Sequence, residues 1–507
     1  MSGLMLNEDC NHFFVNRRNK ALGIREVDTW ADQYAGTQVD ELILNVNAMR
    51  TSYASRVWEP WWHGYDPEGG DEQPFLADVT PAARKTTREW IHTAWQLHRD
   101  GIDIYERWIA RCRVNGMKAR LSMRMNDVHS VDEERHPMHS SFWRDKPELR
   151  RVPYKFTSWT DKALDYGQQE VREYAFALIQ EMMERYDADG LELDWMRFGY
   201  HFKPGYEEEG AAILTAFTAD VRALLDKWET KRGHRISLSA RVPSRPQTAL
   251  HLGMDAVQWA RRGLVDTIVV TPFWATIETD MPIELWKRLL EGTGVRLAAG
   301  LEVLIRAYPA SALRQTNSLE TVRGAATSLL ARGADGIYLF NYMDSDTTIE
   351  DIHDYPQLIR EVGHPETLAG KPRRHVVTYA DTWAAGERAA YALPIACAAG
   401  AHAALRIHIG PMPADSEYAE VRLGVGMDDT LEPTGLRLLL NGADCDFIGR
   451  ITLPKPIPEG PVYAFEVPAG AVRDGYNAID LLPADEFTVL WAEMAILPVR
   501  GRAMNDV

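Results

Sequence analysis

The sequence predicts a (β/α)8 TIM barrel followed by a C-terminal β-sandwich domain. Eight short segments rich in apolar and β-branched residues recur through the first two-thirds of the chain, and helix-like stretches separate most of them. Two of these units resemble each other, because residues 188–194 and residues 334–340 both turn through Asp-Gly into an apolar strand. Beyond about Pro365, short alternating strands separated by Gly, Pro and Asp replace this pattern. Eightfold strand–helix alternation is typical of a parallel barrel, and the later pattern is typical of a sandwich.

The eight predicted strands occupy residues 4–9, 41–47, 118–124, 190–195, 236–242, 266–272, 295–302 and 336–341. Helix signals between them support the alternation. Thr80 supplies an N-cap hydroxyl before Pro81, which suits the first helical position. Residues 317–320 (NSLE) resemble a capping box at the start of a helix that stops at Gly333. We therefore expect residues 1–365 to form the catalytic barrel.

Two long insertions, residues 48–79 and 125–165, interrupt the regular spacing. Both follow predicted strands, so they should lie on the carboxyl face of the barrel, where active sites of this fold are built. The first carries Trp58, Trp61 and Trp62. These indoles predict an apolar platform for a sugar or its leaving group, and packing of the insertion against the barrel is the alternative.

The remaining residues, 366–507, should form the accessory β-sandwich domain, after a linker at residues 370–374. The predicted strands include residues 404–409, 420–425, 436–440, 462–467 and 487–491. This region contains few candidate catalytic groups, so we expect the chemistry to belong to the barrel.

Charge and cysteine content exclude several classes of protein. The chain has 56 Lys and Arg against 73 Asp and Glu, a formal charge of −17, which argues against binding to nucleic acid or to anionic membranes. The 4 Cys have no ligand spacing, and the pair His136 and His139 has no third ligand spaced to join it, so we expect no metal and no cofactor. We find no signal peptide or transmembrane segment, and a cytoplasmic location is the default expectation.

Polar residues at the carboxyl ends of the predicted strands are the first candidates for catalysis. They are Asn7, Asp9, Asn45, Asn47, Arg124, Asp127, His129, Glu192, Asp194, Arg197, Arg241, Glu302 and Asn341. Such a set suits a polar, anionic ligand of sugar size, because a guanidinium binds a carboxylate bidentately. The alternative is structural: the arginines could be buried ion-pair partners of Glu192 and Asp194.

Five of these residues, in their order and separations, resemble the inverting exo-sialidases of glycoside hydrolase family 156. They are Asp9, Arg124, His129, Arg197 and Asn341. The resemblance implies a (β/α)8 catalytic domain, a β-rich C-terminal domain, a homodimer, and hydrolysis of terminal α-linked sialic acids on glycans. It also implies that His129 is the Brønsted acid, Asp9 the Brønsted base, Arg124 and Arg197 the carboxylate-binding pair, and Asn341 a substrate contact.

This assignment is chemically coherent. Inversion in a single displacement needs an acid and a base on opposite faces of the sugar, separated by ~6.5–9.5 Å in carboxylate pairs. A histidine can serve as the acid because its ordinary pKa is ~6.5. The Asp-box turns of propeller sialidases are not found in the sequence. Two alternatives stay open: a conventional barrel glycosidase that uses Asp194 and Glu302, and a non-catalytic glycan-binding protein.

Overall fold

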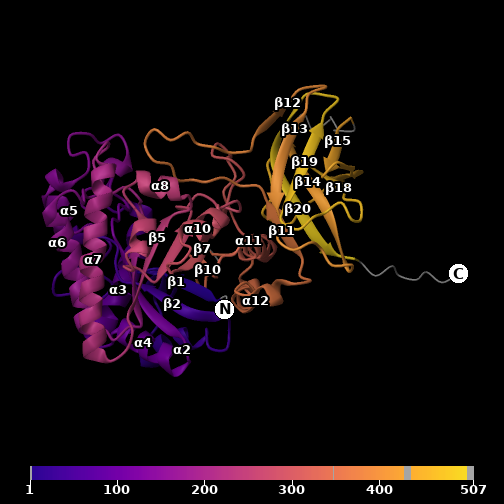
Figure 1. Ribbon diagram of the computed structural model, residues 1–507. Coiled ribbons are helices and arrows are strands. Elements are labelled where there is room, and N and C mark those ends of the chain that lie inside the picture. The colour runs from indigo at the N-terminus through magenta and orange to yellow at the C-terminus, as the bar shows by residue number, and fades with distance from the viewer. Residues whose placement is uncertain (1–2, 346–347, 427–434, 500–507) are drawn as a thin grey trace.

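The computed structural model describes residues 3–345, 348–426 and 435–499 (Figure 1). Eight parallel strands close into a barrel in the order β1-β10-β7-β6-β5-β4-β3-β2. They are β1 (Leu4–Glu8), β2 (Val39–Asn45), β3 (Lys118–Arg124), β4 (Gly190–Asp194), β5 (Ser237–Pro243), β6 (Thr267–Thr271), β7 (Arg296–Glu302) and β10 (Gly336–Phe340). Each overlaps one predicted strand, so the predicted (β/α)8 barrel is confirmed. The short strands β8 (Leu304–Ile305) and β9 (Gln315–Thr316) form a hairpin after β7.

Helices follow most of the barrel strands and surround the barrel (Figure 1). They are α1 (His12–Asn16), α2 (Ile24–Asp32), α3 (Pro81–Arg99), α4 (Ile104–Val114), α5 (Ser141–Asp145), α6 (Gln169–Arg185), α7 (Glu207–Arg232), α8 (Pro246–His251), α9 (Ala256–Arg261), α10 (Ile283–Leu289), α11 (Leu319–Ala331), α12 (Tyr355–Glu361) and α13 (Pro365–Leu368). Short 3-10 turns lie at Pro74–Leu76, Pro147–Leu149, Trp159–Lys162 and Ile352–Asp354. None of the helices in the described ranges is long and apolar enough to cross a lipid bilayer.

Two of these helices begin where the sequence signals place them. Pro81 is the first residue of α3, although the Thr80 side chain makes no capping hydrogen bond. Ser318 caps α11, because its hydroxyl accepts a hydrogen bond from the backbone N–H of Thr321. Helix α11 then packs against β7 and β10 of the barrel, whereas α3 packs against α1.

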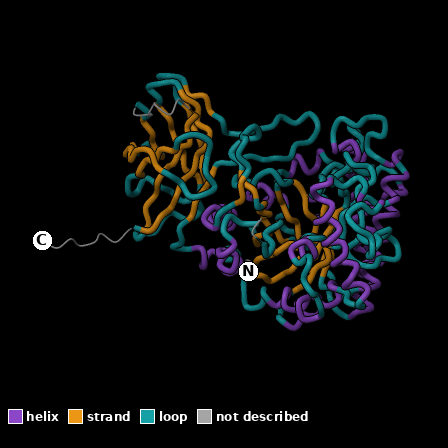
Figure 2. Tube along the Cα trace, turned by 180° about the vertical axis from the view of Figure 1, so that it is seen from behind, coloured by secondary structure: helices purple, strands orange, loops and turns teal. Residues whose placement is uncertain are grey.

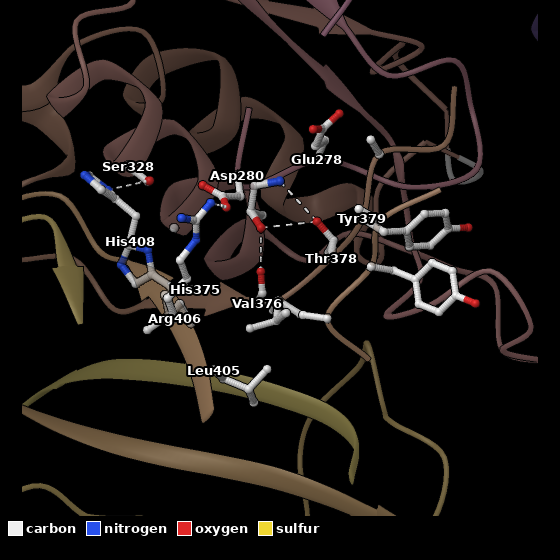
Figure 3. Close-up of a pocket in the computed structure, with 18 of the residues that line it drawn as sticks. Glu278, Asp280, Ser328, His375, Val376, Thr378, Tyr379, Leu405, Arg406 and His408 are labelled. Carbon is white, nitrogen blue, oxygen red and sulfur yellow. Dashed lines mark hydrogen bonds and ion pairs between the residues drawn. The ribbon is translucent and has the colours of Figure 1, made fainter. Parts of the chain in front are cut away.

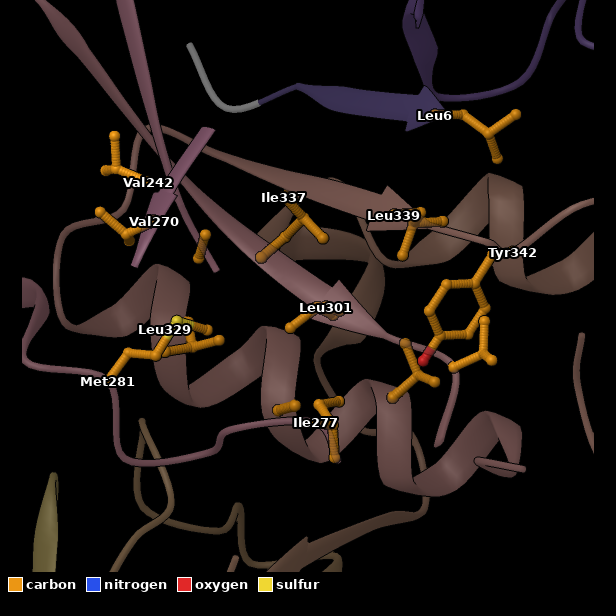
Figure 4. Close-up of a cluster of buried hydrophobic side chains, with 14 of the residues drawn as sticks. Leu6, Val242, Val270, Ile277, Met281, Leu301, Leu329, Ile337, Leu339 and Tyr342 are labelled. Atoms are coloured by element: carbon orange, nitrogen blue, oxygen red, sulfur yellow. The ribbon is translucent and has the colours of Figure 1, made fainter. Parts of the chain in front are cut away.

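The apolar core has two layers because successive strand residues face opposite sides of the barrel wall. Leu301 and Leu339 point outward and pack between the strands and α11, and Leu6 of β1 belongs to the same cluster (Figure 4). Met5, Val269, Ala298, Tyr338 and Phe340 belong to a separate cluster inside the barrel. Each fully buried Val, Leu, Ile, Phe or Met side chain contributes roughly 1.5–3 kcal/mol to the stability of the fold. The filled interior leaves the carboxyl ends of the strands as the place where polar side chains can gather.

The C-terminal part of the chain consists of two antiparallel sheets that form the predicted β-sandwich (Figure 2). One sheet has the order β11-β20-β14-β18-β17 with β12 paired to β20, and the other has the order β13-β19-β15-β16. The strands are β11 (Arg373–Val376), β12 (Ile395–Cys397), β13 (Ala403–His408), β14 (Glu417–Gly426), β15 (Arg437–Leu440), β16 (Ala443–Asp444), β17 (Asp446–Ile451), β18 (Val462–Glu466), β19 (Tyr476–Leu482) and β20 (Phe487–Pro498).

Strand β11 of the sandwich packs directly on helix α11 of the barrel. At Gly324 of α11, a Cβ atom would lie 2.1 Å from the carbonyl oxygen of Arg374, so only glycine permits this approach. Nearby, the Ser328 hydroxyl hydrogen-bonds to Nδ1 of His408 at 2.8 Å. From β11 the chain runs back over the barrel through residues 377–394, which we call the strap, and then enters β12. The strap therefore connects the sandwich to the face of the barrel.

The tryptophans of the first insertion are packing residues. Trp58 is stacked on Tyr174 of α6 with ring centroids 4.3 Å apart, and Trp61 is fully buried. Trp62 is stacked on His98 of α3 at 5.0 Å. The predicted sugar platform is therefore wrong for these three indoles, which hold residues 48–79 against helices.

Candidate active site

Four of the five predicted site residues form one connected group at the carboxyl ends of β1, β3 and β4. Asp9 directly follows β1, and its Oδ2 lies 2.8 Å from Nη2 of Arg124, the last residue of β3. Arg197 follows β4, and its Nη2 lies 2.7 Å from Nε2 of His129 in the loop after β3. Parallel pairing brings these strand ends to one rim, so residues almost 190 positions apart in sequence become neighbours.

Asn341 lies on the same rim but is not linked to this group. It directly follows β10, which pairs with β1 so that Leu339 is opposite Leu6. Its φ of 63° is left-handed, a conformation that Asn tolerates better than most residues. Among the described hydrogen bonds, none joins Asn341 to Asp9, His129 or the two arginines.

Asp127 connects the two halves of the group and has a role that the sequence did not assign. Its carboxylate accepts hydrogen bonds from the backbone N–H and from Nδ1 of His129, each at 2.9 Å. It also lies 3.3 Å from Nη1 of Arg124. Because Nδ1 then carries the proton, Nε2 of His129 faces Arg197 as an acceptor. The sequence signal for this role is the spacing of Asp127 and His129, two residues apart and shortly after a strand.

The arginines lower the pKa of both predicted catalytic groups. Burial raises the pKa of Asp9, but the charges of Arg124 and Arg197 outweigh burial and hold the pKa well below its usual range. Burial lowers the pKa of His129, and Arg197 lowers it further, although Asp127 opposes both effects. Asp9 is therefore an ionised carboxylate, and His129 is biased toward neutral imidazole while Arg197 is beside it.

The second candidate pair of carboxylates has separated roles. Asp194 makes an ion pair of 2.7 Å with Arg241, and both side chains are almost completely buried. The other oxygen of Asp194 accepts the backbone N–H groups of Met196 and Arg197. Asp194 is therefore a structural partner that orients the start of the loop carrying Arg197.

Glu302, at the end of β7, has no such partner. Burial raises its pKa to about 8, against the opposing charge of Arg197. Its Oε2 is buried without a hydrogen-bond partner, and Oε1 accepts only the backbone N–H of Val303. A carboxyl with this pKa is protonated at neutral pH, so Glu302 can donate a hydrogen bond into the site.

The aromatic surface beside the site comes from other loops than the sequence suggested. Phe198, with a φ of 68°, lies edge-on to the His129 ring at 4.8 Å. Trp159 and Phe273 complete a triangle with Phe198, with ring centroids 5.4–5.6 Å apart. Trp274 extends this surface outward and is 40% exposed. We call Trp159, Phe198, Phe273 and Trp274 the aromatic wall.

His136 and His139, two further histidines of the second insertion, lie next to the loop that carries His129. Nε2 of His139 lies 2.9 Å from the backbone carbonyl of His129, and the side chain is fully buried. Its backbone N–H donates to the carbonyl of His136. Across residues 3–345, 348–426 and 435–499, no group of three or more His, Cys, Asp and Glu is placed to hold a metal ion. His139 therefore supports the loop that carries His129.

Comparison with protein-family models and with curated proteins finds no match to this chain. Among solved structures it is similar to α-L-fucosidase isoenzyme 2 from Paenibacillus thiaminolyticus, at 13% identity and a TM-score of 0.44, over 74% of this chain and 52% of that one. It is also similar to the PgaB glycoside hydrolase domain from Bordetella bronchiseptica, at 10% identity and a TM-score of 0.39, over 72% and 99% of the two chains. A third is a family GH18 chitinase from Chromobacterium violaceum, at 10% identity and a TM-score of 0.36, over 99% and 89%. This chain spans about half the length of the fucosidase.

Proposed function

We propose that the protein is an exo-α-sialidase that hydrolyses terminal sialic acids from glycans with inversion at the anomeric carbon. One observation carries this proposal: an aspartate and a histidine at the carboxyl rim of the barrel are each in contact with an arginine. Asp9 is paired with Arg124, and His129 is paired with Arg197. Two guanidiniums beside a candidate base and a candidate acid suit a sugar whose reacting carbon carries a carboxylate.

The substrate carboxylate would be shared by Arg124 and Arg197. Arg124 is buried and Arg197 is half-buried, and Nε of Arg197 has no hydrogen-bond partner among the described residues. Binding of an anion there offsets the positive charge that depresses the pKa of His129 and that of Asp9. The substrate then favours the imidazolium form of His129 and makes Asp9 a stronger base. In this scheme the ligand itself prepares the acid and the base.

The reaction follows as one displacement. Nε2 of His129 donates its proton to the glycosidic oxygen as the bond from that oxygen to the anomeric carbon breaks. Asp9 accepts a proton from a water molecule whose oxygen bonds to the opposite face of the same carbon. The products are the leaving alcohol and free sialic acid of inverted configuration. Arg124 and Arg197 hold the carboxylate so that charge and geometry are set before the bond breaks.

Release of sialic acid from an α-sialyllactose tests this function. Wild-type protein should liberate lactose and sialic acid in equal amounts, and the Asp9→Ala and His129→Ala variants should each lose orders of magnitude in kcat. Binding of the sialoside without hydrolysis would instead show the glycan-binding alternative. Wild-type rates in both variants would remove the two role assignments.

The conventional two-carboxylate glycosidase is a second candidate because of Glu302. Its pKa of about 8 is what a general acid needs at neutral pH. Asp194, however, is engaged by Arg241 and two backbone amides, so it does not present a free carboxylate. If Glu302→Gln abolishes turnover while His129→Ala keeps most of it, Glu302 is the acid and the sialidase assignment of His129 is wrong.

A further inference from the structure

We propose that the strap completes the active site by holding part of the aromatic wall, and that this wall binds the leaving-group sugar of the sialoside. The inference rests on the proposed function and deepens it, because it assigns a second half to the same site. It gives the segment between barrel and sandwich a role in substrate selection. Asp381 is the positioning residue in this scheme.

Asp381 binds three consecutive backbone N–H groups of the loop between β6 and α10. Its Oδ1 accepts from Phe273 at 2.7 Å, and its Oδ2 accepts from Trp274 at 2.9 Å and from Ala275 at 2.7 Å. The Asp381 carboxylate therefore fixes the backbone at Phe273 and Trp274, two of the four residues of the wall. A loop anchored by three charge-assisted hydrogen bonds loses the freedom to turn its aromatic side chains away.

The last residue of β11 and the start of the strap hold the same loop at a second point, near a pocket between the barrel and the sandwich (Figure 3). The Thr279 hydroxyl donates to the carbonyl of Val376 at 2.7 Å, and the Thr279 backbone N–H donates to the Thr378 hydroxyl at 3.1 Å. Next to these contacts, Asp280 makes an ion pair of 2.8 Å with Arg406 of β13. The loop is thus anchored to the sandwich side at one end and to Asp381 at the other.

The wall starts at the catalytic group that must reach the leaving group. His129 contacts Phe198, and Phe198 contacts Phe273 at 5.5 Å. A Brønsted acid touches the glycosidic oxygen, so the first sugar of the leaving group lies within a few ångströms of His129. The rings that adjoin His129 and continue outward are the surface available to that sugar. Sugars present an apolar face that stacks on such rings.

Two features distinguish the wall from a packing cluster. Trp274 is 40% exposed although it is a large apolar side chain. The guanidinium of Arg314 lies over one face of the Trp274 ring, with Cζ 3.8 Å from the ring centroid. Phe198 keeps a left-handed backbone, which costs a bulky residue energy and persists mainly where function requires it. The exposed indole of Trp274 is joined to the strained Phe198 through the ring of Phe273, an arrangement that suits a ligand surface.

The test compares two substrates that share sialic acid and differ in the leaving group. Sialyllactose has a disaccharide leaving group, whereas methyl α-sialoside releases only methanol. Trp274→Ala should lower kcat/KM for sialyllactose roughly tenfold, as expected for loss of one stacking contact, and should leave methyl sialoside within about twofold. The loss should lie mainly in KM. Because Trp274 is exposed, its replacement leaves the core intact.

Asp381→Asn and Asp381→Ala should reproduce this selective loss, the alanine variant more strongly, since asparagine keeps one acceptor oxygen. Glu387→Gln is the matched control, because Glu387 lies on the strap but binds Thr248 and His251. It should leave the ratio of the two substrates unchanged.

Equal losses on both substrates, or no loss on either, would overturn the inference. A change of molar mass by light scattering in Trp274→Ala, without a change in the substrate ratio, would show that the wall is an interface between copies and would also overturn it. Failure of wild-type protein to hydrolyse either substrate would instead refute the proposed function, so the two failures are distinguishable.

Discussion

Nε2 of His129 lies 2.7 Å from Nη2 of Arg197, so the predicted acid is held by a cation. Burial lowers the pKa of His129, and this contact lowers it further. An acid that is deprotonated until an anion arrives discriminates against neutral sugars. It also protects the site from protonating solvent or unrelated ligands.

Removal of Arg197 should therefore raise the pKa of His129. We expect the imidazole of the Arg197→Met variant to titrate at higher pH than in the wild type, measured from its NMR ring shifts. Activity should fall despite the better acid, because carboxylate binding is lost. Arg235→Met, on the exposed surface near β5, is the control and should leave the His129 titration unchanged. An unchanged or lower pKa in Arg197→Met would show that the contact does not control His129.

Asp127→Asn should impair the acid selectively. The amide nitrogen of asparagine can donate to Nδ1, which moves the ring proton to Nε2 and sets it against Arg197. We expect a loss of about 10²–10⁴-fold in kcat for sialyllactose and a much smaller loss for an aryl sialoside, whose leaving group needs little protonation. Equal losses on both substrates, measured as kcat, would mean that Asp127 does not act through proton donation.

Asp194→Asn should destabilise the fold more than it affects the chemistry. Breaking a buried ion pair leaves the charge of Arg241 uncompensated, at a cost of about 3–5 kcal/mol. The denaturation midpoint should fall, and the double change Asp194→Asn with Arg241→Met should recover part of it. Folded Asp194→Asn protein should keep measurable turnover. Complete loss of turnover at an unchanged midpoint would favour the two-carboxylate glycosidase.

Glu302 should make the stability of the fold depend on pH. Burial raises its pKa from 4.5 to about 8, so the folded protein retains a proton that the unfolded chain releases above pH 4.5. The stability from this group is full below pH 4.5 and is lost as the pH rises through about 8. Glu302→Gln should lose less thermal stability between pH 5 and pH 8 than the wild type, with Glu291→Gln at an exposed site as the control. If thermal stability depends on pH in the same way in wild type and in Glu302→Gln, Glu302 is not protonated in the folded protein.

The barrel and the rim residues could be predicted because both depend on local patterns. Apolar strands with polar ends recur eight times, and parallel pairing then brings Asp9, Arg124 and Arg197 together whatever lies between them. Asp127 was visible at a strand end, but its role requires the ring orientation of His129, which spacing does not define.

The aromatic wall could not be predicted because it combines single residues from three loops. Trp159 belongs to the second insertion, Phe198 follows β4 and Phe273 follows β6. The denser tryptophan cluster that includes Trp58 and Trp61 resembles a binding surface in the sequence. In the structure, Trp58 packs against α6 and Trp61 packs against α3. Asp381 lies in a segment without helix or strand, 106 to 108 residues away from the amides that it binds.

The configuration of the released sugar tests the central claim, a single displacement by His129 and Asp9, most directly. Proton NMR during the first minutes of sialoside hydrolysis distinguishes the two anomers before mutarotation mixes them. One displacement predicts that β-sialic acid appears first from an α-sialoside and that α-sialic acid grows in later. Initial release of the α anomer would contradict the account, because retention requires two successive displacements at that carbon.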